Sequence, residues 1–176
     1  IRPDKDAVLS KFRQFKTRFE NAATVTEFFA VHDEYKQFVE EFETNMRLAF
    51  IRFSQDTRDK YYAEEMDYLD EISPEFSVAE AEICKCYLNS KFRKQLEERF
   101  PKVMFTNLQM AVEANNPAIV DLRVEQNKLT TSYTKLISSI TIDFNGERLP
   151  LSGIRKYFTS NDRSLRKAAY MAFGQA

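Results

Sequence analysis

Ile140-Thr-Ile-Asp-Phe-Asn145-Gly146-Glu-Arg-Leu149 is the stretch that decides the fold, because it interrupts a chain otherwise patterned as helix. The Asn145-Gly146 pair supplies the two positive φ angles that a tight type I′ turn needs, so the stretch predicts a β-hairpin near residues 139–150. Helical signals resume directly afterwards, at Leu151-Ser152 and again at Ser160-Asn-Asp-Arg163. A generic helical bundle has no reason to carry a lone hairpin at this point, so the arrangement can mark a lineage.

Helical periodicity dominates the part of the chain before the hairpin. A first helix is predicted from apolar residues that recur at steps of four, three and four, namely Val8, Phe12, Phe15 and Phe19. A second begins near Thr24 and carries its apolar stripe from Phe28 to Phe53, nearly thirty residues. A helix of that size is about 40 Å long at 1.5 Å per residue, which favours an extended hairpin of helices.

Proline and asparagine residues divide the rest of the helical sequence before the hairpin into separate predicted helices. The sequence Ile72-Ser73-Pro74 predicts the end of a third helix, with Ser73 as the N-cap and Pro74 as the first residue of the next one. Shorter helices are expected up to Pro101 and over 103–114, and a long helix from Pro117 has apolar residues at Leu122, Leu129, Tyr133, Leu136 and Ile140. The predicted fold is mainly α, with long antiparallel helices and one small hairpin, in a single helical domain over residues 1–176.

The composition sets limits on the class of protein. Hydrophobic residues make up 43% of the chain and charged residues 30%, as in an ordinary globular protein. The net charge of −1 creates no overall field that would recruit nucleic acid or an anionic membrane. No apolar run approaches the roughly 20 residues that a membrane span needs, and the N-terminus has no signal-peptide core. We therefore expect a cytoplasmic protein without nucleic-acid or membrane partners.

The residue types that most often carry chemistry are sparse. His32 is the only histidine, and its position between Phe28 and Tyr35 predicts a hydrogen-bonded histidine at the edge of the core. A single histidine excludes His-Glu-x-x-His and any His₂ zinc site made wholly within this chain, as well as a ferritin-type di-iron site. Cys84 and Cys86 lie two residues apart on a predicted helix, do not face each other, and are expected to be reduced thiols.

Charged and aromatic clusters have simple structural interpretations. The acidic residues are predicted to lie on solvated helix faces with partners such as Arg47 and Lys36; they are Glu40, Glu41, Glu43, Glu64, Glu65, Asp67, Asp70 and Glu71. A basic group near the C-terminus is interpreted as a surface face, with a phosphate or peptide-carboxylate patch as the alternative; it comprises Arg155, Lys156, Arg163, Arg166 and Lys167. Tyr61 and Tyr62 are predicted to be packing residues. No residue of this chain is predicted to be catalytic, cofactor-binding or metal-binding.

The C-terminal stripe predicts that part of the protein is missing. Its apolar members are Leu165, Ala168, Ala169, Ala172 and Phe173, and the chain stops just after them. An apolar helix face with no later helix or strand to cover it suggests that the element against which it packs is absent from this chain. We therefore expect a fragment of a larger protein, with apolar surface exposed around Leu165 and Phe173.

Several short motifs follow one another in a characteristic order. They are Glu71-Ile72-Ser73-Pro74, Ser90-Lys-Phe92-Arg93, Glu125-Gln-Asn127-Lys128-Leu129, Tyr133-Thr-Lys-Leu136, Ile142-Asp-Phe144-Asn-Gly146, Ser160-Asn-Asp162-Arg163 and Arg166-Lys-Ala-Ala-Tyr170. Together they resemble the N-terminal region of the oligoendopeptidase F-type zinc metallopeptidases, a branch of the thimet oligopeptidase family. The resemblance is densest over residues 60–173. Each motif is weak by itself, and their order and spacing carry the specificity.

The resemblance implies an architectural role for this chain. In that family the N-terminal helices wall one side of a deep channel, while zinc and the general base lie in a later domain, on a helix bearing His-Glu-x-x-His with a further glutamate ligand downstream. This chain contains no His-Glu-x-x-His motif, so the resemblance implies that the zinc ligands lie outside it. The implied partners are the C-terminal catalytic domain of the same polypeptide and short peptide substrates. The alternative is a stand-alone helical interaction module without catalysis, built on the same amphipathic helices.

Overall fold

The computed structural model describes residues 2–176, so Ile1, where the predicted domain begins, lies outside the described residues. The chain forms two compact units, one ending at Lys128 and the other running from Leu129 to Ala176. The described part is mainly helical with one two-stranded antiparallel sheet, which confirms the predicted fold class.

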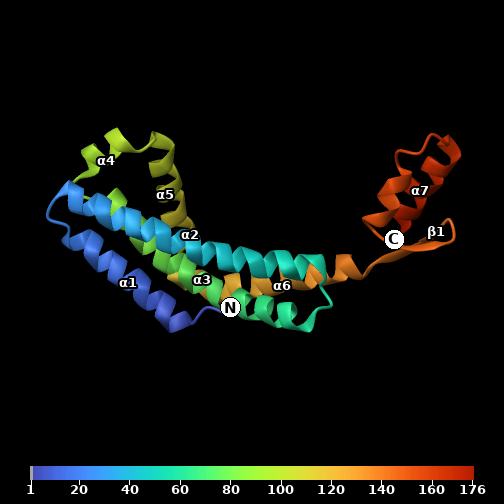
Figure 1. The fold of residues 1–176 in the computed structure, drawn as a ribbon, viewed down its shortest axis with the longest axis horizontal. Coiled ribbons are helices and arrows are strands. Elements are labelled where there is room, and N and C mark those ends of the chain that lie inside the picture. Colours follow the sequence, from blue (N-terminus) through green and yellow to red (C-terminus); the bar gives the residue numbers. More distant parts are fainter. Residues whose placement is uncertain (1) are drawn as a thin grey trace. The chain divides into compact units, whose positions relative to one another are not determined.

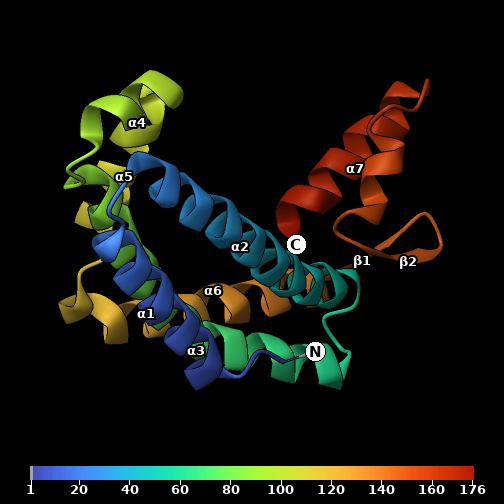
Figure 2. The same ribbon diagram turned by 60° about the vertical axis from the view of Figure 1, so that its left-hand side comes forward.

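Three long helices form the body of the first unit and lie side by side (Figures 1 and 2). The unit continues through shorter helices, of which α5 packs against α3. In chain order the elements are α1 (Lys5–Asn21), α2 (Val25–Gln55), α3 (Lys60–Leu88), α4 (Arg93–Arg99), α5 (Lys102–Ala114), a 3₁₀ helix η1 (Pro117–Ile119) and α6 (Val120–Ser139), which runs on into the second unit.

The starts of the long helices follow from local side-chain chemistry. Thr24 accepts a hydrogen bond from the backbone N–H of Glu27 at 3.2 Å, and the Glu27 carboxylate accepts one from the backbone N–H of Ala23 at 2.8 Å. Asp4 and Asp59 cap α1 and α3 in the same way. Such caps satisfy N–H groups that the first turn of a helix leaves without partners. The predicted start of the second helix near Thr24 is confirmed.

Aromatic side chains fill the core of the first unit. In the stripe predicted for the first helix the three phenylalanines are buried, with Phe12 and Phe19 each only 4% exposed, and Val8 is half-buried. Phe19 packs on Phe28 of α2, with ring centroids 4.8 Å apart, and Phe28 meets Tyr87 of α3 edge-on at 5.2 Å. Aromatic pairs in these geometries add to the free energy gained by burial alone.

The predicted break at Ile72-Ser73-Pro74 is wrong, because α3 continues through Pro74 to Leu88. Pro74 has no N–H, so it cannot donate the helical hydrogen bond to the Asp70 carbonyl. The Asn127 side chain of α6 supplies a donor instead, with Nδ2 3.2 Å from the Asp70 carbonyl oxygen and 3.2 Å from Ser73 Oγ. This tertiary contact lets the helix carry a buried proline, and Ser73 is an interior residue rather than a cap.

The second unit contains the predicted hairpin. Strands β1 (Thr141–Phe144) and β2 (Glu147–Pro150) pair antiparallel, with Phe144 opposite Glu147. The turn residues Asn145 and Gly146 have φ angles of 52° and 78°, the positive values that the Asn-Gly pair predicts. A 3₁₀ helix η2 (Gly153–Tyr157) and α7 (Arg163–Gln175) follow.

The C-terminal stripe has a packing partner within its own unit, so the prediction that it lacks one is wrong. Ala169 is fully buried in a cluster with Ile142, Leu149 and Ile154, and Phe173 packs against the same cluster. Leu165 is half-buried, while Ala168 is exposed. The packing partner is the preceding hairpin together with η2. The prediction considered only elements that would follow the stripe in the sequence.

Candidate functional site

A groove in the first unit has a largely apolar floor. It has a volume of about 390 Å³ and lies chiefly between α2 and α3, with Asn127 of α6 at one side. Phe42 and Met46 of α2 and Leu69 and Phe76 of α3 contribute to the floor, where the Phe42 and Phe76 rings meet edge-on at 5.1 Å. A surface of this kind suits contact with an apolar or extended chain segment.

Carboxylates accompany this apolar floor. Glu43 pairs with Arg47 at 3.1 Å on the exposed face of α2, and Glu80 of α3 also lines the groove. Although Glu80 as a whole residue is exposed, the pKa of its carboxyl group is raised, because local packing removes water and the charge of Glu43 lies nearby. The described residues lining the groove include no histidine or cysteine.

The predicted solvation of the acidic residues is confirmed for six of them and wrong for Glu65 and Asp70. Glu43 with Arg47 and Glu40 with Lys36, at 3.7 Å, form the expected pairs. Glu65 and Asp70 are only 6% and 7% exposed. The spacing could have shown this for Glu65, which lies three residues after Tyr62 and four before Leu69 on the inward stripe of α3.

Glu65 has a partner from a remote part of the chain. The guanidinium group of Arg2 donates to Glu65 Oε1 at 2.9 Å, and Arg2 also lies over the Tyr68 ring at 4.7 Å. The pairing compensates the buried carboxylate, because an ionised group in a poorly solvated position needs an opposite charge. It is therefore a structural contact between the N-terminal segment and α3.

His32 is half-buried beside the core, as predicted. Its Nδ1 lies 2.7 Å from the hydroxyl of Tyr87, and its ring is 4.9 Å from that of Phe100. Burial lowers the pKa of His32 and raises that of Tyr87 far above its ordinary value. At neutral pH the phenol therefore stays protonated and the imidazole neutral, and the two groups share a hydrogen bond beside the aromatic core.

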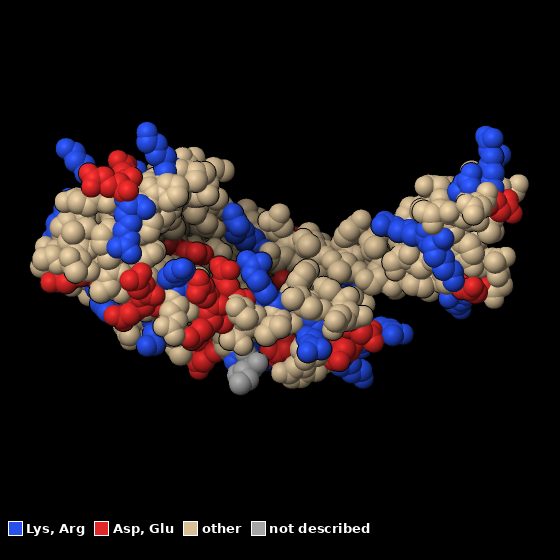
Figure 3. Space-filling model, turned by 45° about the horizontal axis from the view of Figure 1, so that its top comes forward, with Lys and Arg blue, Asp and Glu red and all other residues tan. Residues whose placement is uncertain are grey.

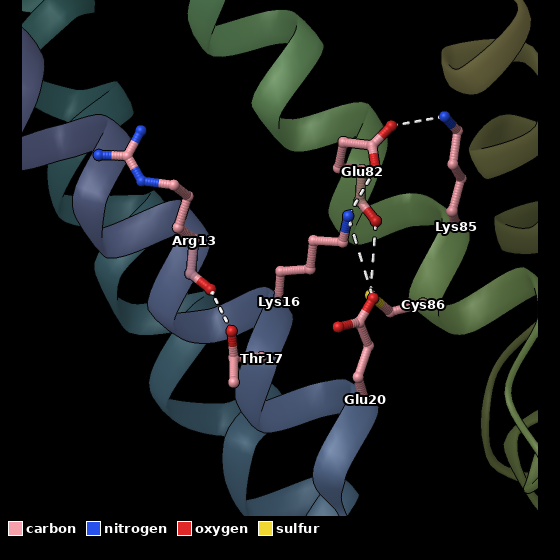
Figure 4. Close-up of polar contacts among 7 residues, drawn as sticks. All are labelled: Arg13, Lys16, Thr17, Glu20, Glu82, Lys85 and Cys86. Carbon is pink, nitrogen blue, oxygen red and sulfur yellow. Dashed lines mark hydrogen bonds and ion pairs between the residues drawn. The ribbon is translucent and has the colours of Figure 1, made fainter.

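The two cysteines are free thiols and form no disulfide with each other. Figure 4 shows the surroundings of Cys86, whose Sγ donates to the Glu82 carbonyl oxygen at 3.4 Å beside the Lys16–Glu82 ion pair of 2.8 Å. Burial raises the pKa of both Cys84 and Cys86 to about 11. Both are therefore protonated and unreactive near neutral pH.

The basic residues near the C-terminus lie in the second unit, which has seven Lys and Arg residues against three Asp and Glu. Figure 3 shows this excess of positive charge on the surface of that unit. Several of these side chains are already engaged. Lys156 pairs with Glu147 at 2.5 Å, Arg166 donates to the Ser160 carbonyl, and Arg155 lies over the Phe173 ring. The interpretation as a surface face and its alternative, an anion-binding patch, both stay predictions.

The zinc implied by the resemblance finds no fitting ligands here. Within residues 2–176, no three or more His, Cys, Asp or Glu side chains come together in a way that could hold a metal ion. None of the helices in that same range is both long and apolar enough to cross a membrane.

The two adjacent tyrosines at the start of α3 pack against each other. Tyr61 is exposed and Tyr62 half-buried, and their rings meet edge-on at 5.0 Å.

Comparison with protein families and solved structures places the chain. A model of the peptidase M3 N-terminal domain matches residues 1–115. The chain belongs to the peptidase M3 family. Solved structures extend the match of this M3 domain to 99% of the chain. A protein described as an oligoendopeptidase F of Bacillus anthracis strain Ames has a TM-score of 0.90 at 32% identity, and PZ peptidase A, solved with an inhibitor, has 0.90 at 31%.

A third structure, described as an oligoendopeptidase F, has a TM-score of 0.91 at 28% identity. These findings confirm the resemblance to oligoendopeptidase F drawn from the ordered motifs. The M3 domain spans about a third of each solved chain, between 31% and 32% of its length. A comparison with curated protein sequences gave no match.

Proposed function

We propose that this M3 domain is the N-terminal helical part of a zinc-dependent oligopeptidase that hydrolyses short peptides, and that its helices wall one side of the substrate channel. The observation that carries the proposal is the agreement of the whole fold, over 99% of the chain, with structures described as oligoendopeptidase F. The zinc ligands and the general base belong to a catalytic domain elsewhere in the same polypeptide, and the protein is cytoplasmic.

The described residues support a role in binding and exclusion. The groove between α2 and α3 combines an apolar floor with carboxylates at its edge. Such a surface can bind the side chains of a peptide without being specific for a particular sequence. The long helices pack around a core of aromatic side chains, and they are suited to form a rigid wall because closely packed interiors resist deformation. A rigid wall admits short or unfolded peptides and keeps folded proteins away from the reacting centre.

The test uses the full-length protein. Purified protein should cleave a short quenched fluorescent peptide, lose that activity after dialysis against a chelator, and regain it with added zinc. The sequence of the full-length reading frame should contain His-Glu-x-x-His downstream of this domain. A reading frame without that motif, or cleavage that is indifferent to the chelator, would overturn the proposal and favour the interaction module.

A further inference from the structure

Helix α6 has its large apolar residues on an exposed face. Leu122, Leu129, Tyr133 and Leu136 are between 61% and 64% exposed. Successive positions are separated by seven, four and three residues, so at 100° per residue all four fall within an arc of about 60°. We call these four residues the α6 stripe.

The opposite side of the same helix faces inward and is polar. Asn127 donates to α3 at the Pro74 position, and Thr131 is only 6% exposed. These two residues lie about 140° or more from the centre of the α6 stripe around the helix axis. The side of α6 at Asn127 therefore contacts α3, and the large apolar residues lie on the opposite, exposed side of the helix.

The residues that border the α6 stripe are mixed in charge. Gln126, Thr130 and Ser132 are uncharged, while Asp121 and Glu125 carry carboxylates. The seven-four-three spacing of the stripe is the spacing with which one helix packs along another in a coiled-coil seam.

We propose that the α6 stripe is the docking face for a helix from the remaining two thirds of the full-length polypeptide. The occupant follows from chain length, because the solved relatives are about three times as long as this chain while matching 99% of it. This inference rests on the proposed function insofar as both require a further domain. The inference adds that the further domain covers the α6 stripe of the M3 domain, and that it does so with a helix.

The test measures accessibility along α6 in the full-length protein. Leu129→Cys and Leu136→Cys place thiols within the α6 stripe, and Lys128→Cys places one on an exposed position of the same helix outside it. Each variant is labelled with a maleimide, and labelling is quantified by mass spectrometry of the α6 peptide, so that Cys84 and Cys86 do not interfere. We expect the two thiols within the α6 stripe to label at least about tenfold more slowly than the thiol of the Lys128→Cys variant, because labelling of a covered position requires local opening.

Equal labelling rates at all three positions would overturn the proposal. Protection that disappears on dilution, together with a doubled mass in sedimentation, would also overturn it and assign the face to a second copy of the chain. Peptidase activity is measured on the same samples. An active, chelator-sensitive protein with an open α6 stripe would refute only the docking inference. A protected stripe in a protein without metal-dependent activity would refute only the proposed function.

Discussion

The contact between Asn127 and the proline of α3 gives the sharpest prediction for stability. In Asn127→Ala, the buried region around Asp70 loses the donor that replaces the missing N–H of Pro74. Leaving a buried acceptor without its partner costs about 1–3 kcal/mol, and the 3.2 Å lengths place this contact toward the lower half of that range. We therefore expect the free energy of unfolding to fall by about 1–2 kcal/mol.

The control is a double-mutant cycle with Pro74→Ala. An alanine at position 74 restores the N–H that can bond to the Asp70 carbonyl, so Asn127→Ala should cost about 1 kcal/mol less in that background. Urea denaturation followed by far-UV circular dichroism measures all four proteins, and Lys128→Ala on the exposed side of α6 should change the free energy by less than about 0.5 kcal/mol. An equal cost of Asn127→Ala in both backgrounds would refute the idea that Asn127 acts on the proline.

Three further predictions concern single positions. The folded-state pKa of His32 lies below 6.5, so the unfolded chain binds more protons than the folded chain as the pH falls below that value. The free energy of unfolding should therefore decrease there, and His32→Gln should remove this contribution to its pH dependence. Arg2→Ala should destabilise the fold by about 1–2 kcal/mol because Glu65 stays buried without its partner, and unchanged urea denaturation would contradict this. Gly146→Ala should cost about 1 kcal/mol through its positive φ, whereas Gly174→Ala in α7 should cost nothing, and thermal melts compare the two.

The sequence predicts those elements whose causes are local. Asn145-Gly146 determines the hairpin because both residues tolerate positive φ, and Thr24 marks the start of α2 because its side chain caps the first turn. The break at Pro74 is the instructive error. The local rule that proline ends a helix fails there because Asn127, more than fifty residues away in sequence, supplies the missing donor.

The candidate site is harder to predict, because its parts are brought together only by packing. The groove joins Phe42 of α2 to Leu69 of α3, and no short motif links the two. The burial of Glu65 depends on Arg2 in the same way, since both residues are ordinary charged residues until the segments meet. The family, in contrast, could be inferred from the order of several motifs because that information is spread along the chain.

Peptide-length selection in the full-length protein tests the central claim most directly. A series of quenched peptides of increasing length, together with a stably folded protein substrate, is incubated with the enzyme, and kcat/KM is measured for each. If the helices described here wall a channel, kcat/KM should fall steeply beyond a limiting length and the folded protein should remain intact. Cleavage of the folded protein at a rate similar to that of the short peptides would contradict the account.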